Sequence, residues 1–374
     1  NETTYHFDSS ATSWIPCTTV EAPQVMPPSF RISSYNVLVD SIYPPAWERF
    51  GILVRTLLSE SARADVLVLQ EVSDDFLCHL LKDDEVRSLW PYVSHAPPDQ
   101  RDVGPLLSLR NVVVLSRWSF DWEMVTFERR HKGAVVVKMK SVGKLAQSGS
   151  FQPLVIAGIH LTCGLTDGSV AAKKSQLRSL MSHLSGNYSD CPWIVAGDFN
   201  VTTSTRTIED AIKTQSISAQ TVRTLSGLEQ LLSESGLLDA WAVVRSHHGH
   251  GDTDVEDEDI AEGEQGATFD PGKNPLAAEI VGHGLTHRPQ RYDRILLKGE
   301  DALEIANFSM FGYPDPEEQR CGSDHWGVRA TVKITKSPAL ANVEIENISI
   351  AVPPVGLDAA FLQSFVAHHS AFPT

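Results

Sequence analysis

Apolar residues recur along the chain at two spacings, which predict strands and helices in alternation. Short apolar runs, such as residues 66–69 and 193–196, have the length of buried strands. Apolar residues three and four positions apart, as in residues 47–60, indicate amphipathic helices. The pattern extends over residues 30–336 and is compatible with one α/β domain.

The individual elements are bounded by polar, Gly-rich and Pro-containing stretches. Predicted strands cover residues 30–39, 65–71, 112–115, 134–139, 154–161, 193–196, 291–298 and 328–334, and residues 302–311 contain another. Predicted helices cover residues 47–60, 74–81, 169–184 and 225–235.

Three segments lack this pattern. Residues 1–29 are expected to form an extended N-terminal arm, because they mix Ser, Thr and Pro without periodicity. Residues 246–266 predict an acidic, solvated loop, since residues 251–264 hold eight acids and no base. Residues 337–374 do not continue the alternation of strands and helices. They are expected to form a C-terminal extension, either packed on the core or leading towards a further domain.

Charge and cysteine content narrow the class of protein. A formal net charge of −16 excludes a general basic field, so a polyanionic substrate would be held by local groups or by metal. No run of about 18 apolar residues occurs, and no membrane partner is predicted. The five cysteines are spread widely without metal-ligand spacing, which favours reduced thiols and an intracellular location, in the nucleus or cytoplasm.

Polar residues that can do chemistry stand at or near the ends of the predicted strands. Each one alone has a structural explanation as a turn former, a surface acid or a core histidine. Together they form an ordered series in which strands would hold a site rigid while loops shape it. The series consists of Asn36, Glu71, His160, Asp198 with Asn200, Asp293, and Asp324 with His325.

This series resembles the endonuclease/exonuclease/phosphatase family of metal-dependent phosphoesterases. The resemblance covers residues 30–335, and all of the family's motifs are present in order. They are Ser34-Tyr35-Asn36, Leu69-Gln70-Glu71, Ile159-His160-Leu161, Gly197-Asp198-Phe199-Asn200, Tyr292-Asp293-Arg294-Ile295 and Ser323-Asp324-His325. The resemblance implies a four-layered α/β sandwich, with two mixed β-sheets face to face and helices outside.

The resemblance also implies a metal site. Glu71 would offer a carboxylate to Mg²⁺, or to Mn²⁺, with Asp324 as a direct or indirect ligand and Asn36 orienting the ligands. Mg²⁺ prefers oxygen ligands and keeps several waters.

The remaining motif residues are expected to be catalytic. Asp198 would orient or deprotonate the attacking water, and Asn200 would donate its amide to the phosphorane. His325, paired with Asp293, would hydrogen-bond a phosphate oxygen, and His160 would contact the phosphate or help the leaving group. The division of acid and base roles among Asp198, His160 and His325 stays open.

Within the family, Ser323-Asp324-His325-Trp326-Gly327 is most similar to the tyrosyl-DNA phosphodiesterase 2 branch. Ser34-Tyr35-Asn36 and Gly197-Asp198-Phe199-Asn200 depart from that branch and also occur among RNA-directed relatives. The resemblance therefore implies a nucleic-acid end as substrate, on DNA or on RNA. Removal of a 2′,3′-cyclic phosphate, or a 3′ exonuclease or deadenylase activity, is the alternative.

Substrate contacts are predicted from local cations and aromatics. Arg130 and His131 lie in the best basic cluster, residues 129–132, which could also be a solvated hairpin end. Trp326 could stack on a base or pack in the core. A non-catalytic binding module is disfavoured because no motif is degraded. An inositol or lipid phosphatase is disfavoured because no polybasic or amphipathic stretch supports membrane binding, and the acidic balance of the chain opposes it. Of five Asn-x-Ser/Thr triplets, one begins at Asn200 in the predicted site, and all are interpreted as chance.

Overall fold

Two β-sheets form the centre of the fold. This computed structural model describes residues 2–17, 26–40, 45–98, 109–128, 132–139, 153–247, 261–281, 287–299, 302–314 and 320–335. Both sheets are mixed, because β3 runs parallel to β4 in one and β9 runs parallel to β10 in the other, while their other pairs are antiparallel.

The larger sheet has eight strands in the order β13-β14-β3-β4-β6-β5-β1-β2. These are β1 (Tyr5–Asp8), β2 (Ser13–Pro16), β3 (Ser29–Asn36), β4 (Val66–Ser73), β5 (Tyr92–Val93), β6 (Leu109–Ser116), β13 (Leu303–Phe311) and β14 (Gly327–Ile334). The smaller sheet has six strands in the order β11-β12-β10-β9-β8-β7. These are β7 (Phe120–Thr126), β8 (Gly133–Met139), β9 (Val155–His160), β10 (Trp193–Asp198), β11 (Leu238–Asp239) and β12 (Asp293–Lys298).

Strand β4 begins with four consecutive apolar residues, Val66 to Leu69, because it is covered on both faces. Val66 and Val68 belong to the core between the sheets, whereas Leu67 and Leu69 belong to a second cluster on the outer face. Successive side chains of a strand point to opposite faces, so a strand covered on both faces needs apolar residues at every position.

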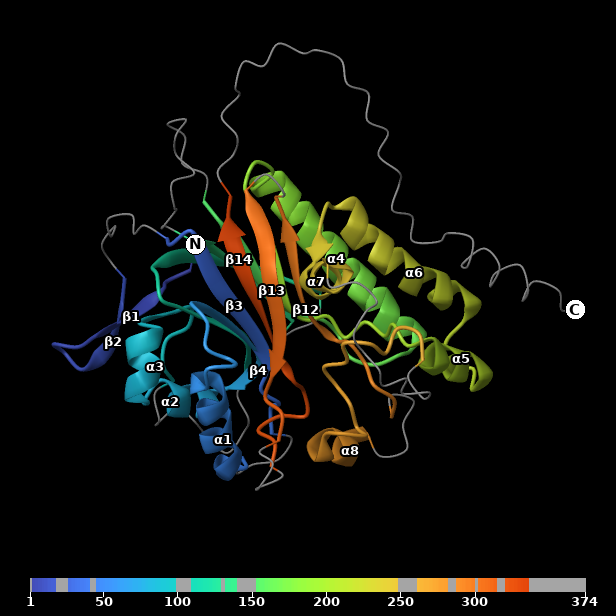
Figure 1. Cartoon of the computed structure of the whole chain (residues 1–374), viewed down its shortest axis with the longest axis horizontal. Coiled ribbons are helices and arrows are strands. Elements are labelled where there is room, and N and C mark those ends of the chain that lie inside the picture. Colours follow the sequence, from blue (N-terminus) through green and yellow to red (C-terminus); the bar gives the residue numbers. More distant parts are fainter. Residues whose placement is uncertain are drawn as a thin grey trace, which may run out of the picture. The chain divides into compact units, whose positions relative to one another are not determined.

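The helices cover the outer faces of the two sheets (Figure 1). On the larger sheet lie α1 (Trp47–Leu58), α2 (Asp74–Leu80) and α3 (Asp84–Leu89). On the smaller sheet lie α4 (Asp167–Asn187), α5 (Thr205–Lys213) and α6 (Ala219–Glu234). Two short helices, α7 (Ala240–His247) and α8 (Pro275–Val281), follow later in the chain. Helix, sheet, sheet and helix form four layers, so the predicted fold class is confirmed.

The two sheets approach closely near the end of β9. A Cβ on Gly158 would lie 2.8 Å from Val68 Cγ1 and 2.9 Å from Val112 Cγ1, closer than side chains pack. Glycine at this position therefore keeps β9 near β4 and β6, two residues before His160. This close approach lets side chains from both sheets meet at the strand ends.

The prediction of an N-terminal arm was wrong for the part of the segment that the structure describes. Strands β1 and β2 pair with each other, and β1 also pairs with β5, so they extend the edge of the larger sheet. Each strand has only four residues, and none of their side chains is fully buried, so the sequence carries no clear alternation.

The prediction of a solvated acidic loop over residues 246–266 was wrong at its C-terminal end. Glu264 is only 3% exposed; it accepts a hydrogen bond from Ser204 Oγ at 2.7 Å and pairs with Arg288. Residues 248–260 lie outside the described part of the chain, as does the predicted extension over residues 337–374.

Several elements differ from the sequence prediction in extent. Helix α6 begins six residues earlier than expected, because Ser218 caps it by accepting from Thr221 N–H at 3.3 Å. Strand β7 and helices α3, α5, α7 and α8 were not predicted, since they are short or only partly buried. Among the described residues, no helix combines the length and apolar character needed to cross a membrane.

Candidate active site

Strand pairing brings the predicted site residues to one end of both sheets. In the smaller sheet, Asp198 of β10 lies directly opposite His160 of β9 on one side and Asp293 of β12 on the other. In the larger sheet, β3 pairs in parallel with β4 as far as Asn36 and Gln70, and Glu71 is the next residue of β4. Side chains from distant parts of the chain therefore converge because the strands that carry them end at the same edge.

Asn36 links the two sheets through a hydrogen-bonded carboxylate pair. Its Nδ2 donates to Glu71 Oε1 and to Asp198 Oδ2, each at 3.0 Å, while its Oδ1 accepts from Leu38 N–H. Both Nδ2 protons and the amide oxygen are thus in use. In this arrangement Asn36 fixes the two carboxylates relative to each other.

The backbone at Glu71 is strained. Glu71 has a φ of 58°, in the left-handed region that a side chain other than Gly rarely adopts, and the register of β4 shifts between Leu69 and Val72. Such a conformation costs about 1–3 kcal/mol and persists where the surrounding structure enforces it. The shift turns Glu71 towards the site, while Gln70 stays buried against Ser34.

The Asp198 carboxylate is almost fully enclosed. Oδ1 accepts from the Asn200 backbone N–H at 2.8 Å, and Oδ2 accepts from Asn200 Nδ2 at 3.0 Å. Asn200 Nδ2 also donates to Leu161 O, so both of its protons are engaged here. Burial, followed by the nearby Asp293 carboxylate, raises the pKa of Asp198.

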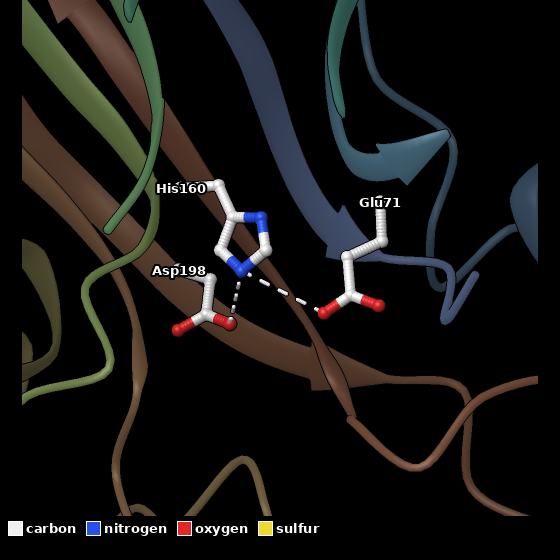
Figure 2. A group of neighbouring side chains, drawn as sticks. All are labelled: Glu71, His160 and Asp198. Atoms are coloured by element: carbon white, nitrogen blue, oxygen red, sulfur yellow. Dashed lines mark ion pairs between the residues drawn. The ribbon is translucent and has the colours of Figure 1, made fainter. Parts of the chain in front are cut away.

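His160 lies between the two carboxylates (Figure 2). Its Nε2 is 3.6 Å from Glu71 Oε1 and 3.8 Å from Asp198 Oδ2, and its Nδ1 is 2.6 Å from Asn111 Oδ1. An amide oxygen only accepts hydrogen bonds, so the proton of the neutral ring is on Nδ1 and the Nε2 lone pair faces the site. Burial and the Lys132 ammonium lower the pKa of His160.

His325 is held by a carboxylate instead of an amide. Its Nδ1 is 2.7 Å from Asp293 Oδ2, which also accepts from Thr268 Oγ1 at 2.6 Å. Burial opposes the charge on His325, but Asp293 and Asp324 outweigh it and raise the pKa of His325 well above its usual value. The ring is therefore a cation whose Nε2–H is a hydrogen-bond donor.

Asp324 sits at the edge of this network. It is 6% exposed and accepts a hydrogen bond from Ser323 Oγ, and burial raises its pKa to about 6. Ser323 Oγ also lies 2.6 Å from Asn36 O, so it ties residues 322–325, named the catalytic turn after their predicted role, to the end of β3.

The donor set fits a divalent metal. Among the described residues, two trios place one ligand atom each within 4.8 Å of one another: Glu71 with His160 and Asp198, and Asp198 with Asp293 and His325. Asp324 belongs to neither trio. Buried carboxylates with raised pKa values and the unpartnered Asp293 Oδ1 leave negative charge that a hard cation would balance.

The structure describes one of the three residues predicted to bind substrate, Trp326. Arg130 and His131 lie outside the described residues, whereas Lys132, from the same basic run, places its Nζ 3.2 and 3.3 Å from the two His160 ring nitrogens. Trp326 is 2% exposed, so its side chain packs in the protein interior, one of the two alternatives left open by the sequence. A substrate contact through Trp326 stays a prediction.

Sequence reasoning missed Asn111, Thr268 and the role of Lys132. Asn111 begins the buried part of β6 with a φ of 65°, and Thr268 lies in a loop 25 residues before its partner Asp293. Neither has a motif of its own. An Asn directly before an apolar run was the only available signal for Asn111.

Three comparisons with known proteins bear on this site. The model of the Endonuclease/Exonuclease/phosphatase family matches residues 33–325. No curated protein matches the chain.

Solved structures share the fold at low sequence identity. D. rerio TDP2 complexed with a single-strand DNA product is 17% identical, with a TM-score of 0.50, covering 82% of this chain and 99% of that one. SmcL is also 17% identical, with a TM-score of 0.51 and coverages of 82% and 99%. An endonuclease/exonuclease/phosphatase from Beutenbergia cavernae is 18% identical, with a TM-score of 0.50 and coverages of 84% and 73%. The fold, the ordered motifs and the family match together show that this chain belongs to the endonuclease/exonuclease/phosphatase family.

Proposed function

We propose that the chain is a Mg²⁺- or Mn²⁺-dependent phosphodiesterase that acts on the ends of nucleic-acid strands. The family consists of enzymes that hydrolyse phosphoester bonds. The observation that supports activity in this chain is the Asn36 bridge, which holds Glu71 of one sheet and Asp198 of the other at 3.0 Å each.

Glu71, with Asn36 and Asp324 nearby, would hold the metal. A bound divalent cation would supply charge stabilisation at the phosphoryl oxygens and a lower pKa for a water. Glu71 has the ionised carboxylate needed for this: burial opposes its charge, but hydrogen bonds from Asn36 Nδ2 and the Val39 N–H, with the His325 cation nearby, favour the carboxylate.

Asp198 is suited to take the proton of the attacking water. Its carboxylate is fixed by Asn36 and Asn200, and its raised pKa favours proton uptake once the water oxygen bonds to phosphorus. His325 is suited to donate its Nε2–H to a non-bridging phosphate oxygen, because Asp293 keeps the ring protonated. His160 presents a neutral Nε2 as an acceptor or ligand.

A nucleic-acid end is proposed as the substrate because the motifs of this chain are similar to those of relatives that act on nucleic acids. D. rerio TDP2 has been solved with a single-strand DNA product, and Ser323-Asp324-His325-Trp326-Gly327 is similar to that branch. Tyr35 and Phe199, the departures that favoured an RNA end, are both 0% exposed, so they act through packing and not by touching substrate.

A substrate panel tests the proposal. Rates would be compared on 5′-tyrosyl DNA, 2′,3′-cyclic-phosphate RNA, poly(A) and inositol phosphates, with Mg²⁺, Mn²⁺ or EDTA. We expect hydrolysis of a nucleic-acid end that EDTA abolishes. Preference for the cyclic phosphate or poly(A) would select the RNA alternative, and turnover of inositol phosphates alone would contradict a nucleic-acid substrate.

Variants of the site provide a second test. Asp198→Ala and His325→Ala are each expected to reduce kcat by orders of magnitude while the circular dichroism spectrum stays unchanged. His183→Ala, at a histidine that pairs with Glu123 away from the site, is the matched control. Full activity in either site variant would show that the assigned roles are wrong.

A further inference from the structure

A cavity of about 420 Å³ lies beside the catalytic turn and is not part of the site described above. Its polar lining comes from α1 and the loop after it, from the segment that follows β13, and from the start of the catalytic turn. The polar lining residues are Arg55, Thr56, Ser59, Ser61, Tyr313 and Arg320. Gly322, the residue before Ser323, also lines it, so the cavity adjoins the turn that carries Asp324 and His325.

The charged residues of the described lining of this cavity are cations, although the chain as a whole is acidic. Arg55 and Arg320 are exposed, and neither has a carboxylate partner among the described residues, where Arg63, Arg117 and Arg288 all pair with acids. The described lining holds no carboxylate. Residues 315–319 lie outside the described residues. Two guanidinium groups that pair with no carboxylate of the described residues lie beside the hydroxyls of Ser59 and Ser61, and such a set of donors can bind a phosphate.

An exposed aromatic side chain connects the cavity to the active site. Tyr313 is 57% exposed, and its ring centroid lies 5.0 Å from that of Trp326, the residue that follows His325. Among the described residues, Trp47, at 59%, is the other large aromatic side chain that is this exposed. Trp47 and Arg55 are eight residues apart on α1 and so share one face of the helix. Exposed aromatic faces next to cations are typical of surfaces on which single-stranded bases stack.

Arg49 fixes this cavity relative to the reacting groups. The Arg49 side chain is buried and donates to Val37 O at 2.9 Å and to Gly322 O at 2.6 Å. It thereby joins α1, which carries Arg55, to the end of β3 and to the catalytic turn. A ligand held in the cavity would keep a defined position with respect to His325.

We propose that this cavity binds the nucleotide adjacent to the scissile phosphate, with the phosphate of that nucleotide between Arg55 and Arg320 and its base on Tyr313. The inference rests on the proposed function, because it assigns a second contact to the same substrate strand. It explains how an acidic chain holds a polyanion: the cations are placed locally instead of over the whole surface.

Binding of a fluorescently labelled single-stranded hexanucleotide, as DNA and as RNA, tests the inference without turnover. Anisotropy would be measured in EDTA for the wild-type chain and for the double variant Arg55→Gln/Arg320→Gln. We expect Kd to rise roughly tenfold or more, and the slope of log Kd against log salt to fall by about one, as for loss of phosphate contacts. Arg223→Gln, at an exposed arginine of α6, is the control for a change in net charge.

The aromatic contact has its own measurement. Tyr313→Ala should weaken the hexanucleotide by about tenfold, and an abasic version of the hexanucleotide should remove this difference. A wild-type Kd and salt slope in the double variant would overturn the inference. So would a wild-type chain that binds neither hexanucleotide.

Turnover separates this inference from the proposed function. Bis(p-nitrophenyl) phosphate has no flanking nucleotide, so the double variant should hydrolyse it with the wild-type kcat/KM. Equal losses of kcat/KM on this diester and on an oligonucleotide would overturn a separate subsite. A wild-type chain that binds the hexanucleotide through Arg55 and Arg320 but hydrolyses neither compound would contradict the proposed function alone.

Discussion

The His160 and His325 halves of the site have nearly the same construction and opposite electrostatics. Each histidine residue is 5% exposed, and each Nδ1 is held by a side-chain oxygen, at 2.6 Å from Asn111 and at 2.7 Å from Asp293. The pKa of His160 is nevertheless lowered, and that of His325 is raised well above its usual value.

The partner's charge explains this difference. Burial lowers the pKa of both rings, because a low-dielectric surrounding disfavours a cation. His160 has a neutral amide at Nδ1 and the Lys132 ammonium near its ring, whereas His325 has the Asp293 carboxylate. The two histidines thus differ because one has an amide partner and the other a carboxylate partner: His160 is a neutral hydrogen-bond acceptor, and His325 is a cationic donor.

The substitution Asp293→Asn is expected to have the largest effect on kcat, because it removes the difference in charge between the partners of the two histidines. The amide keeps the shape of the side chain, but it no longer stabilises the His325 cation or its tautomer. We expect kcat to fall by roughly 10³- to 10⁴-fold, by analogy with loss of the carboxylate behind a catalytic histidine. Steady-state kinetics at saturating metal measure it, and a loss smaller than about tenfold would show that the charge on His325 is unimportant.

Asn111→Asp would make the His160 half resemble the His325 half. A carboxylate at Nδ1 should raise the pKa of His160 and protonate its Nε2 near neutral pH, so we expect kcat to fall about 10²-fold at pH 7. Since the neutral ring returns at higher pH, the acidic limb of the rate profile should move to higher pH. Asp tolerates the left-handed backbone at this position, which has a φ of 65°. An unchanged pH profile would argue against a role for neutral His160.

Thr268→Val would weaken the His325 half without removing it. The hydroxyl donates to Asp293 Oδ2 at 2.6 Å, and loss of a hydrogen bond to a charged group costs about 1.5–3 kcal/mol. Kcat is expected to fall about tenfold, with an unchanged KM. Thr268→Ser retains the hydroxyl and should retain activity; equal losses in both variants would assign the effect to packing.

The smallest effect is on stability against pH in the metal-free chain. The unfolded pKa of both histidines is the ordinary value of 6.5. Because His325 has a raised folded pKa, its stabilising contribution is fully present below pH 6.5 and is lost as pH rises through that raised pKa. His160 has a lowered folded pKa, so its contribution has the opposite sign: stability falls as pH decreases below 6.5.

Urea titrations in EDTA from pH 5 to 9 would measure both contributions by comparing wild type with His325→Gln and His160→Gln. The difference between wild type and His325→Gln should favour wild type more at low pH, and that for His160→Gln should do so more at high pH. His183→Gln is the control at a histidine outside the site. Parallel curves for the two site variants would contradict the electrostatic difference between the two halves.

The sequence by itself determined which strands carry the motif residues and that these residues lie at or near the strand ends. Val66 to Leu69 must be apolar at every position because β4 is covered on both faces, and Glu71 lies two residues after that run. The same reasoning applies to His160 and Asp198 at the ends of β9 and β10. These predictions succeeded because they depend on local periodicity, which a strand of six to eight residues displays fully.

Only the tertiary structure decided the charge of each histidine. Asn111 lies 49 residues before His160, and Asp293 lies 32 residues before His325, so no local pattern connects either pair. The Asn36 bridge spans 162 residues to Asp198 and forms because the two sheets approach closely at Gly158. A pKa depends on charges within a few ångströms in space, whatever their separation along the chain, and therefore the folded arrangement and not the motif sets the role of each group.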